Sequence, residues 1–185
     1  MINTIIFTGH MIDKVDRSEP RFPANKEKIV TLEIAKKLVI EEEKSEDRIN
    51  AGIAGGACGG DIIFHELCEE MGIPTEMYLA LPIDDFKKAS VSFAGTDWEK
   101  RFNILTKKIP VHILPDTKSN NISLSVWELA NLWMLDKALK NGGSNMTLLA
   151  LWDGKGGDGN GGTEHMVKSA NEEGAKVEII NINKL

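Results

Sequence analysis

The sequence has few cysteines and no long apolar run. Cys58 and Cys68 are the two cysteines, and their separation fits neither a CxxC pair nor a zinc-ligand spacing, even with His112 and His165 considered alongside them. No apolar run approaches the roughly 20 residues that a membrane-spanning helix needs. We therefore expect no disulfide, no metal site, no bound cofactor and no membrane partner.

A targeting leader and an excess of basic residues are also lacking. The first residues read MINTIIFTGH, without the basic start and apolar core of a signal peptide, which predicts a cytoplasmic protein. Lys and Arg number 22 against 28 Asp and Glu, so the net charge is −6. This acidic balance disfavours diffuse binding to a phosphate backbone and argues against nucleic acid as a partner.

The 185 residues, of which 42% are hydrophobic, suit one domain covering 1–185. Short apolar runs alternate with amphipathic stretches, which predicts an α/β fold with a mostly parallel sheet and crossover helices. The expected strands are Thr4–Thr8, Ile49–Ala54, Thr75–Leu81, Val111–Leu114, Thr147–Trp152 and Lys176–Ile182.

Helical patterns lie between these strands. After Pro23, apolar residues recur at four-residue steps at Val30, Ile34 and Leu38, predicting a helix that leaves Glu41–Glu43 in water. Two further helices should start at capping boxes, Thr96–Glu99 and Ser125–Glu128. The second should run to about Lys140 and stop at Asn141-Gly142-Gly143.

Two glycine-rich segments each follow an expected strand and precede an expected helix. The first holds Gly55, Gly56, Gly59, Gly60 and Asp61, and in the second six of the nine residues from Gly154 to Gly162 are glycine. In a parallel sheet this position faces the ligand crevice, where glycine lets the backbone approach a phosphate closely. We therefore expect phosphate binding at the first segment and at Gly161, Gly162 and Thr163, with a mobile flap as the alternative for Gly154–Gly159.

Neither segment has a GKS or GKT sequence or GxGxxG spacing, so ATP hydrolysis and hydride transfer lose support. The stretch GGACGGDIIFHELCEEMGIPTEMYLALPIDDF instead resembles the second strand and helix of the SLOG superfamily, named for the DNA-processing protein A and Lonely Guy families. WDGKGGDGNGGTEH is similar to the later GGT loop of that superfamily. FTGHMID, RSEPRFP and FKKASVSFAGTDWEKRF resemble a branch often fused to signalling modules.

This resemblance implies a single Rossmann-like domain with helices on both faces of the sheet. It also implies a nucleotide or nucleotide-derived ligand, which some members hold or sense and others cleave at a ribose glycosidic bond. Lonely Guy enzymes carry PGGxGTxxE, with a catalytic glutamate three residues after the threonine. Here Glu164 follows Thr163 directly and Met166 stands at the catalytic spacing, so the enzymatic glutamate is not matched.

Three carboxylates are candidates for chemistry or ribose binding. Glu164 could stabilise a cationic transition state or simply suit the helix dipole. Asp61 stands four residues before His65, so the two form either an acid/base unit or a solvated pair at a helix start. Asp153, at a strand end, reaches ribose hydroxyls or forms an Asx-turn.

The first strand ends at Gly9 and His10, which should enter the same crevice, although a structural histidine is equally compatible. Arg17 and Arg21 flank Pro20 and are expected either to clamp phosphates or to lie in a surface turn. Thr163 should bind phosphate at a helix start, an ordinary N-cap being the alternative. The large apolar residues Trp127, Trp133 and Met134 suit a core or subunit interface better than a base platform.

Three classes of function remain open. The first is a sensor or sequestering module for a phosphate-containing, nucleotide-derived molecule such as an ADP-ribose-like signal. The second is a nucleotide N-glycosidic hydrolase using Glu164, Asp61 or Asp153, and the third is an interaction protein without a ligand. The apolar stretch Ile122–Leu139 is the candidate surface for a homo-oligomer.

Overall fold

A computed structural model describes residues 3–44, 49–116, 123–156 and 161–185. Six parallel strands form one sheet in the order β4-β3-β2-β1-β5-β6, which confirms the expected α/β fold with a parallel sheet. The strands are β1 (Asn3–Gly9), β2 (Ile49–Ala54), β3 (Thr75–Leu79), β4 (Val111–Ile113), β5 (Met146–Trp152) and β6 (Lys176–Asn181).

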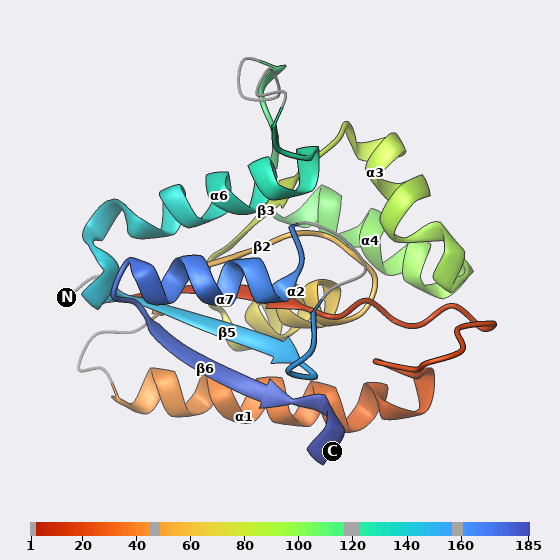
Figure 1. The fold of residues 1–185 in the computed structure, drawn as a ribbon, viewed down its shortest axis with the longest axis horizontal. Coiled ribbons are helices and arrows are strands. Elements are labelled where there is room, and N and C mark those ends of the chain that lie inside the picture. Colours follow the sequence, from red (N-terminus) through yellow and green to blue (C-terminus); the bar gives the residue numbers. More distant parts are fainter. Residues whose placement is uncertain (1–2, 45–48, 117–122, 157–160) are drawn as a thin grey trace.

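Helices cover both faces of the sheet (Figure 1). They are α1 (Glu27–Lys44), α2 (Gly60–Met71), α3 (Ile83–Ser90), α4 (Thr96–Lys108), α6 (Val126–Ala138) and α7 (Thr163–Glu172). The described residues also form short 3₁₀ turns at η1 (Ala24–Lys26), η2 (Ser92–Ala94), η3 (Leu139–Asn141), η4 (Gly143–Asn145) and η5 (Ile182–Lys184).

The alternation of side chains along β1 divides the core between the two faces. Ile5 and Phe7 pack in the cluster with α1, α2 and α4, whereas Ile6 packs with α6 and α7. This division follows from the strand geometry, in which successive side chains point to opposite faces. The central strands β1 and β5 are therefore buried on both faces, as in a parallel sheet covered by helices on both sides.

Helix α1 buries the predicted stripe, since Val30, Ile34 and Leu38 are fully buried. The prediction that Glu41–Glu43 lie in water is wrong for Glu41, which is 7% exposed. Its Oε1 atom accepts a hydrogen bond from Lys176 Nζ at 2.6 Å. Tertiary contact with β6 thus pairs a carboxylate that the local pattern had placed on the surface.

The two predicted capping boxes have different outcomes. At α6 the box is formed, with Ser125 Oγ accepting from the Glu128 amide and Glu128 Oε2 accepting from the Ser125 amide. At α4 the prediction is wrong because the N-cap is Gly95, with φ of 104°, and Thr96 is already the first helical residue. A hydroxyl in that helical position does not reach back to cap the turn.

Helix α6 ends slightly earlier than expected. The α-helix ends at Ala138, two residues before the expected Lys140. A 3₁₀ turn follows to Asn141, before Gly142 with its φ of 85°.

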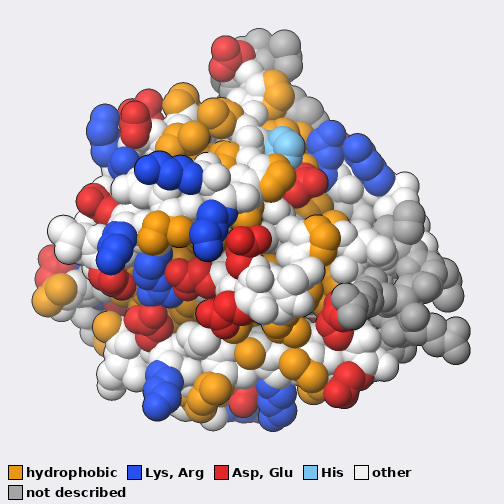
Figure 2. Space-filling view, turned by 180° about the vertical axis from the view of Figure 1, so that it is seen from behind, with side chains coloured by type: hydrophobic (Ala, Val, Ile, Leu, Met, Phe, Trp, Pro, Cys, Tyr) orange, Lys and Arg blue, Asp and Glu red, His pale blue; other side chains and the backbone are white. Residues whose placement is uncertain are grey.

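On the face seen in Figure 2, acidic and basic side chains are interspersed with apolar ones. No helix among the described residues is long and apolar enough to cross a bilayer.

Candidate functional site

The order of the strands marks one place at the carboxyl edge of the sheet. The chain builds β2, β3 and β4 on one side of β1, then returns to add β5 and β6 on the other side. Strands β1 and β5 are paired to their ends, where Gly9 lies opposite Leu151. In open parallel sheets, ligands bind in the crevice at such a switch point. The residues that follow β1 and β5 therefore face the expected site.

A cavity of about 750 Å³ opens at this edge. Its volume falls in the range of small-molecule sites, roughly 300–1,000 Å³. The structure brings together most of the predicted ligand residues around it: Gly9, His10, Arg17, Arg21, Gly55, Asp61, Gly161, Gly162, Thr163 and Glu164.

Three glycines of the first segment and Asp153 do not line the cavity. A Cβ on Gly56 would lie 2.8 Å from Met77 Sδ, and one on Gly60 would lie 2.9 Å from the Phe7 ring. Gly59 has φ of 102° and packs against the backbone that follows β1. A Cβ added to Gly59 would lie 2.7 Å from the backbone nitrogen of Ile12. These glycines allow close packing of the loop within the protein.

Backbone amides of the first segment are also occupied within the protein. The Gly60 amide donates to the His10 carbonyl at 3.2 Å, and the Cys58 amide donates to the Ser90 carbonyl at 2.9 Å. The segment is thus bound to the extension of β1 and to the end of α3. Only Gly55, Ala57 and Asp61 of this segment face the cavity.

The second segment places the start of α7 at the cavity. Thr163 is the first residue of α7 and is buried, and Gly162 is the N-cap residue without a side-chain cap. The Thr163 hydroxyl has no hydrogen-bond partner within the described part of the chain, so the ordinary N-cap alternative is not what the structure has. The first-turn amides of a helix lack intrahelical acceptors, and the dipole favours an anion there. Residues 157–160 of this segment lie outside the described residues.

Gly161 holds the segment against α6. Its φ is 87°, and an added Cβ would lie 2.6 Å from the Glu128 backbone nitrogen. The Asn131 side-chain amide donates to the Gly161 carbonyl. The approach to α7 is therefore fixed by direct contact with the first turns of α6.

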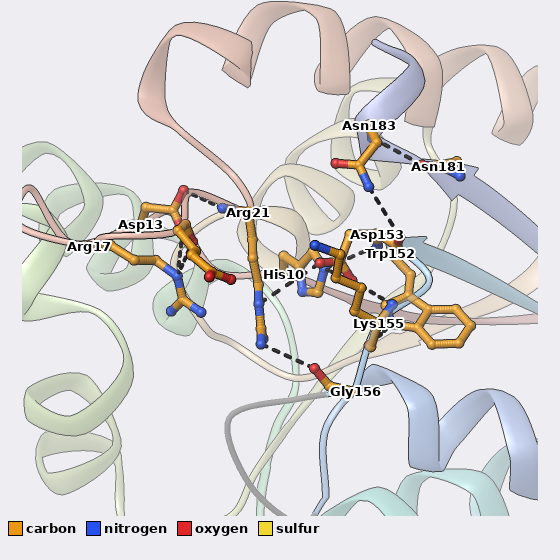
Figure 3. A network of polar contacts seen from close by, with 11 residues as sticks. His10, Asp13, Arg17, Arg21, Trp152, Asp153, Lys155, Gly156, Asn181 and Asn183 are labelled. Carbon is orange, nitrogen blue, oxygen red and sulfur yellow. Dashed lines mark hydrogen bonds and ion pairs between the residues drawn. The ribbon is translucent and has the colours of Figure 1, made fainter.

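At the cavity, a polar network joins the loops that follow β1 and β5 (Figure 3). The Asp153 amide donates to His10 Nε2 at 3.2 Å, and Asp153 Oδ1 lies 3.1 Å from the same nitrogen. Burial lowers the pKa of His10 in spite of the Asp153 carboxylate. Burial alone would raise the pKa of Asp153, but the Lys155 amide, His10 and Arg21 together lower it. Asp153 also forms the Asx-turn considered from the sequence, with its Oδ1 accepting from the Lys155 amide at 3.0 Å.

The two arginines have different roles in this network. Arg21 Nη2 donates to the Gly156 carbonyl at 3.1 Å, and Arg21 Nε lies 3.9 Å from Asp153 Oδ2. Arg17 Nε instead donates to the Glu19 carbonyl at 2.8 Å. Arg21 therefore connects the two loops, whereas this hydrogen bond of Arg17 lies within its own loop. Both side chains line the cavity.

Asp61 is a carboxylate of the cavity lining, in the first turn of α2. Its Oδ2 accepts from the Ala57 amide at 3.3 Å, and an added Cβ on Gly55 would lie 2.6 Å from that oxygen. Burial raises the pKa of Asp61 to about 7, against a smaller lowering by the Ala57 amide. A cavity carboxyl that titrates near neutrality suits proton transfer or hydrogen-bond donation to a ligand.

The predicted acid/base unit of Asp61 and His65 is not formed, and the solvated alternative is also wrong because His65 is fully buried. His65 Nε2 donates to the Gly55 carbonyl at 2.8 Å, and its Nδ1 lies 2.7 Å from Thr75 Oγ1. Burial lowers the pKa of His65 to about 4. This neutral imidazole supports the first glycine segment from within the core.

The apolar part of the cavity lining was not predicted from the sequence. Phe86, Phe93, Trp127 and Met134 line the cavity, and Lys14 reaches over the Phe93 ring, 5.4 Å from its centroid. Trp133 instead is buried, as expected of a core residue. Periodicity alone did not separate Trp127 from Trp133, because both belong to one apolar helix.

The remaining candidate, Glu164, lies at the edge of the site, and Arg101, a further cation, lies away from it. Glu164 is exposed at the cavity mouth on the first turn of α7. Arg101 is outside the lining, where it stacks on Trp98 and pairs with Glu27 and Glu66. Among the described residues, no group of His, Cys, Asp and Glu is arranged to hold a metal ion.

Comparisons with known proteins found likenesses among solved structures. TM1055, a structural genomics target, aligns with 95% of this chain and 72% of its own length, at 14% identity and a TM-score of 0.49. DNA processing protein A from Streptococcus pneumoniae aligns with 97% of this chain at 13% identity and a TM-score of 0.41. This chain spans 59% of the length of that protein. No family model and no curated protein matches the sequence.

Proposed function

We propose that this protein binds a nucleotide or nucleotide-derived molecule, such as an ADP-ribose-like signal, and acts as a sensor or a sequestering module. The observation that supports this most is the start of α7 at the cavity, with the buried residue Thr163 in the cavity lining. A phosphate group would accept hydrogen bonds from the Thr163 hydroxyl and from the first-turn amides of α7. Arg17 and Arg21 would add positive charge beside it.

The experiment is native mass spectrometry and calorimetry with AMP and ADP-ribose as probes. Thr163→Glu should abolish binding by like-charge repulsion, and Thr163→Val should weaken it about tenfold or more through loss of one hydrogen bond to a charged group. Thr31→Val is the matched control, since the Thr31 hydroxyl donates to the Glu27 carbonyl within α1, outside the cavity. Unchanged binding by Thr163→Glu, or no binding of either probe, would exclude the proposal.

A second candidate is hydrolysis of a nucleotide N-glycosidic bond, favoured by Asp61 with its pKa of about 7. In this reaction water adds to the anomeric carbon, the bond to the base breaks, and the water proton passes through the carboxyl to the leaving base. The matching test is incubation with AMP and chromatography for adenine and ribose 5-phosphate. Activity that survives in Asp61→Asn but is lost in Glu164→Gln would transfer the role to Glu164.

Association of the chain with itself stays a prediction. Three large apolar side chains of α6, Trp133, Met134 and Leu135, are buried, whereas Val126, Trp127 and Leu129 are only partly buried and Leu132 is 36% exposed. Light scattering at working concentration, with and without AMP, measures the mass directly.

A further inference from the structure

The cavity has two chemically different parts. One part, at the ends of β1 and β5, is polar and contains His10, Arg21 and Thr163. The other part, beside β3, α3 and α6, is apolar and contains Phe86, Phe93, Trp127 and Met134, together with the small residues Ala80, Ala89 and Ala130. The segment after β2, with Gly55 and Asp61, lies between the two.

The aromatic rings gather on the β3 side of the cavity. The Trp127 ring meets Phe86 edge to face, with 5.9 Å between centroids, so it points from α6 toward α3. Phe93, in the turn that follows α3, is only partly buried, as is Trp127. Both therefore have ring surface left to contact something in the cavity.

The spacing of strands sets the separation of the two parts. From β5 through β1 and β2 to β3 there are three neighbouring strand pairs. At about 4.8 Å each, they separate the ends of β5 and β3 by about 14 Å. A nucleoside monophosphate spans a length of this order between its phosphate and the far edge of its base.

We infer that the apolar part takes the planar base of the ligand, against Phe93 and Trp127, while the phosphate lies at α7 and the sugar beside Asp61. The inference rests on the proposed function and names the class of ligand more closely. A planar aromatic ring is the group that buries most area against such side chains at little conformational cost. The ligand class is thus a base-bearing nucleotide, not a bare sugar phosphate.

The test compares AMP with ribose 5-phosphate, which lacks only the base. AMP should bind at least about tenfold more tightly, since stacking of a base on an aromatic side chain is worth roughly 1–3 kcal/mol. Phe93→Leu and Trp127→Leu should each weaken AMP at least about fivefold and leave ribose 5-phosphate, measured by competition, within about twofold. Trp98→Leu is the matched control, because Trp98 stacks on Arg101 outside the cavity.

The outcomes separate this inference from the proposed function. Equal affinity for the two probes, or equal losses for both in the Phe93 and Trp127 variants, overturns the base site while phosphate binding stands. No binding of AMP, ADP-ribose or ribose 5-phosphate removes the proposed function and the inference together. Two variants on different elements guard against a folding defect in one of them, which circular dichroism would reveal.

Discussion

At the scale of single residues, Asp61 shows how burial gives an ordinary side chain a special property. Its carboxyl contacts the Ala57 amide, and no basic side chain forms an ion pair with it within the described residues. Burial consequently favours the neutral form and raises the pKa to about 7. The close approach of this carboxyl to Gly55 also explains why a side chain at position 55 would displace it.

A raised pKa in the folded state has a defined effect on stability. The folded protein holds a proton on Asp61 that the unfolded chain has already released above pH 3.8, so the contribution of Asp61 to stability is full below that pH and falls up to about pH 7. We expect Asp61→Asn to remove this loss of stability at higher pH. The free energy of unfolding of the variant, relative to wild type, should rise by on the order of 4 kcal/mol between pH 4 and pH 8.

Urea unfolding at several pH values measures this difference, with Glu43→Gln, at an exposed end of α1, as the control. Subtracting wild type from the variant also cancels the contribution of His65, whose lowered pKa acts in the opposite direction between about pH 4 and 6.5. A difference that does not change with pH would show that Asp61 is hydrated and ionised in the folded protein.

At the scale of elements, the starts of α4 and α6 show what a local motif does and does not determine. Both begin near a Thr or Ser followed three residues later by Glu, but only Ser125 and Glu128 exchange their hydrogen bonds. Gly95 takes the cap position of α4 with a positive φ, so the helix starts before the Thr96 hydroxyl could act as a cap. Backbone conformation before the motif decided the difference.

The two sites therefore differ in their response to alanine. Ser125→Ala should lower the free energy of unfolding by about 1 kcal/mol, because the Glu128 amide loses its acceptor. Thr96→Ala, at an exposed helical position without a capping bond, should change it by less than about 0.5 kcal/mol. Chemical denaturation of both variants provides the comparison, and equal losses would contradict the assigned helix starts.

At the scale of the whole molecule, the site exists because α6 and the segment before α7 are held together at one edge of the sheet. Gly161 lies against the backbone of α6, whereas Gly154, at the other end of the same segment, has no atom within 4 Å of an added Cβ. Both have positive φ, 87° and 80°. Substituting each of these two glycines therefore separates the free-energy cost of backbone strain from the cost of steric contact.

Gly154→Ala should cost about 1 kcal/mol from strain alone. Gly161→Ala should cost about 3 kcal/mol or more, because the added Cβ also forces α6 and the segment apart. Urea unfolding gives both values, and AMP affinity should fall in Gly161→Ala more than in Gly154→Ala. Similar costs for the two variants would mean that the segment moves freely against α6.

The order of elements followed from local patterns in the sequence. Apolar runs such as Ile49–Ala54 and Thr147–Trp152 became strands, and the stripe of Val30, Ile34 and Leu38 became the buried face of α1. These features depend on side chains within one element, whose spacing is fixed by strand and helix geometry. The positions of Gly9 and Gly55 at strand ends and of Thr163 at the start of a helix were predictable for the same reason.

Tertiary structure alone decided how those residues are used. In the folded protein, Gly56, Gly59 and Gly60 pack against other protein atoms instead of lining the cavity. Trp127 lines the cavity, and Trp133 is buried. These outcomes depend on distances between elements that are far apart in the chain, and no local spacing contains them. The sequence determined which residues arrive at the carboxyl edge of the sheet, and the packing of α3, α6 and α7 around that edge determined which of them face the cavity.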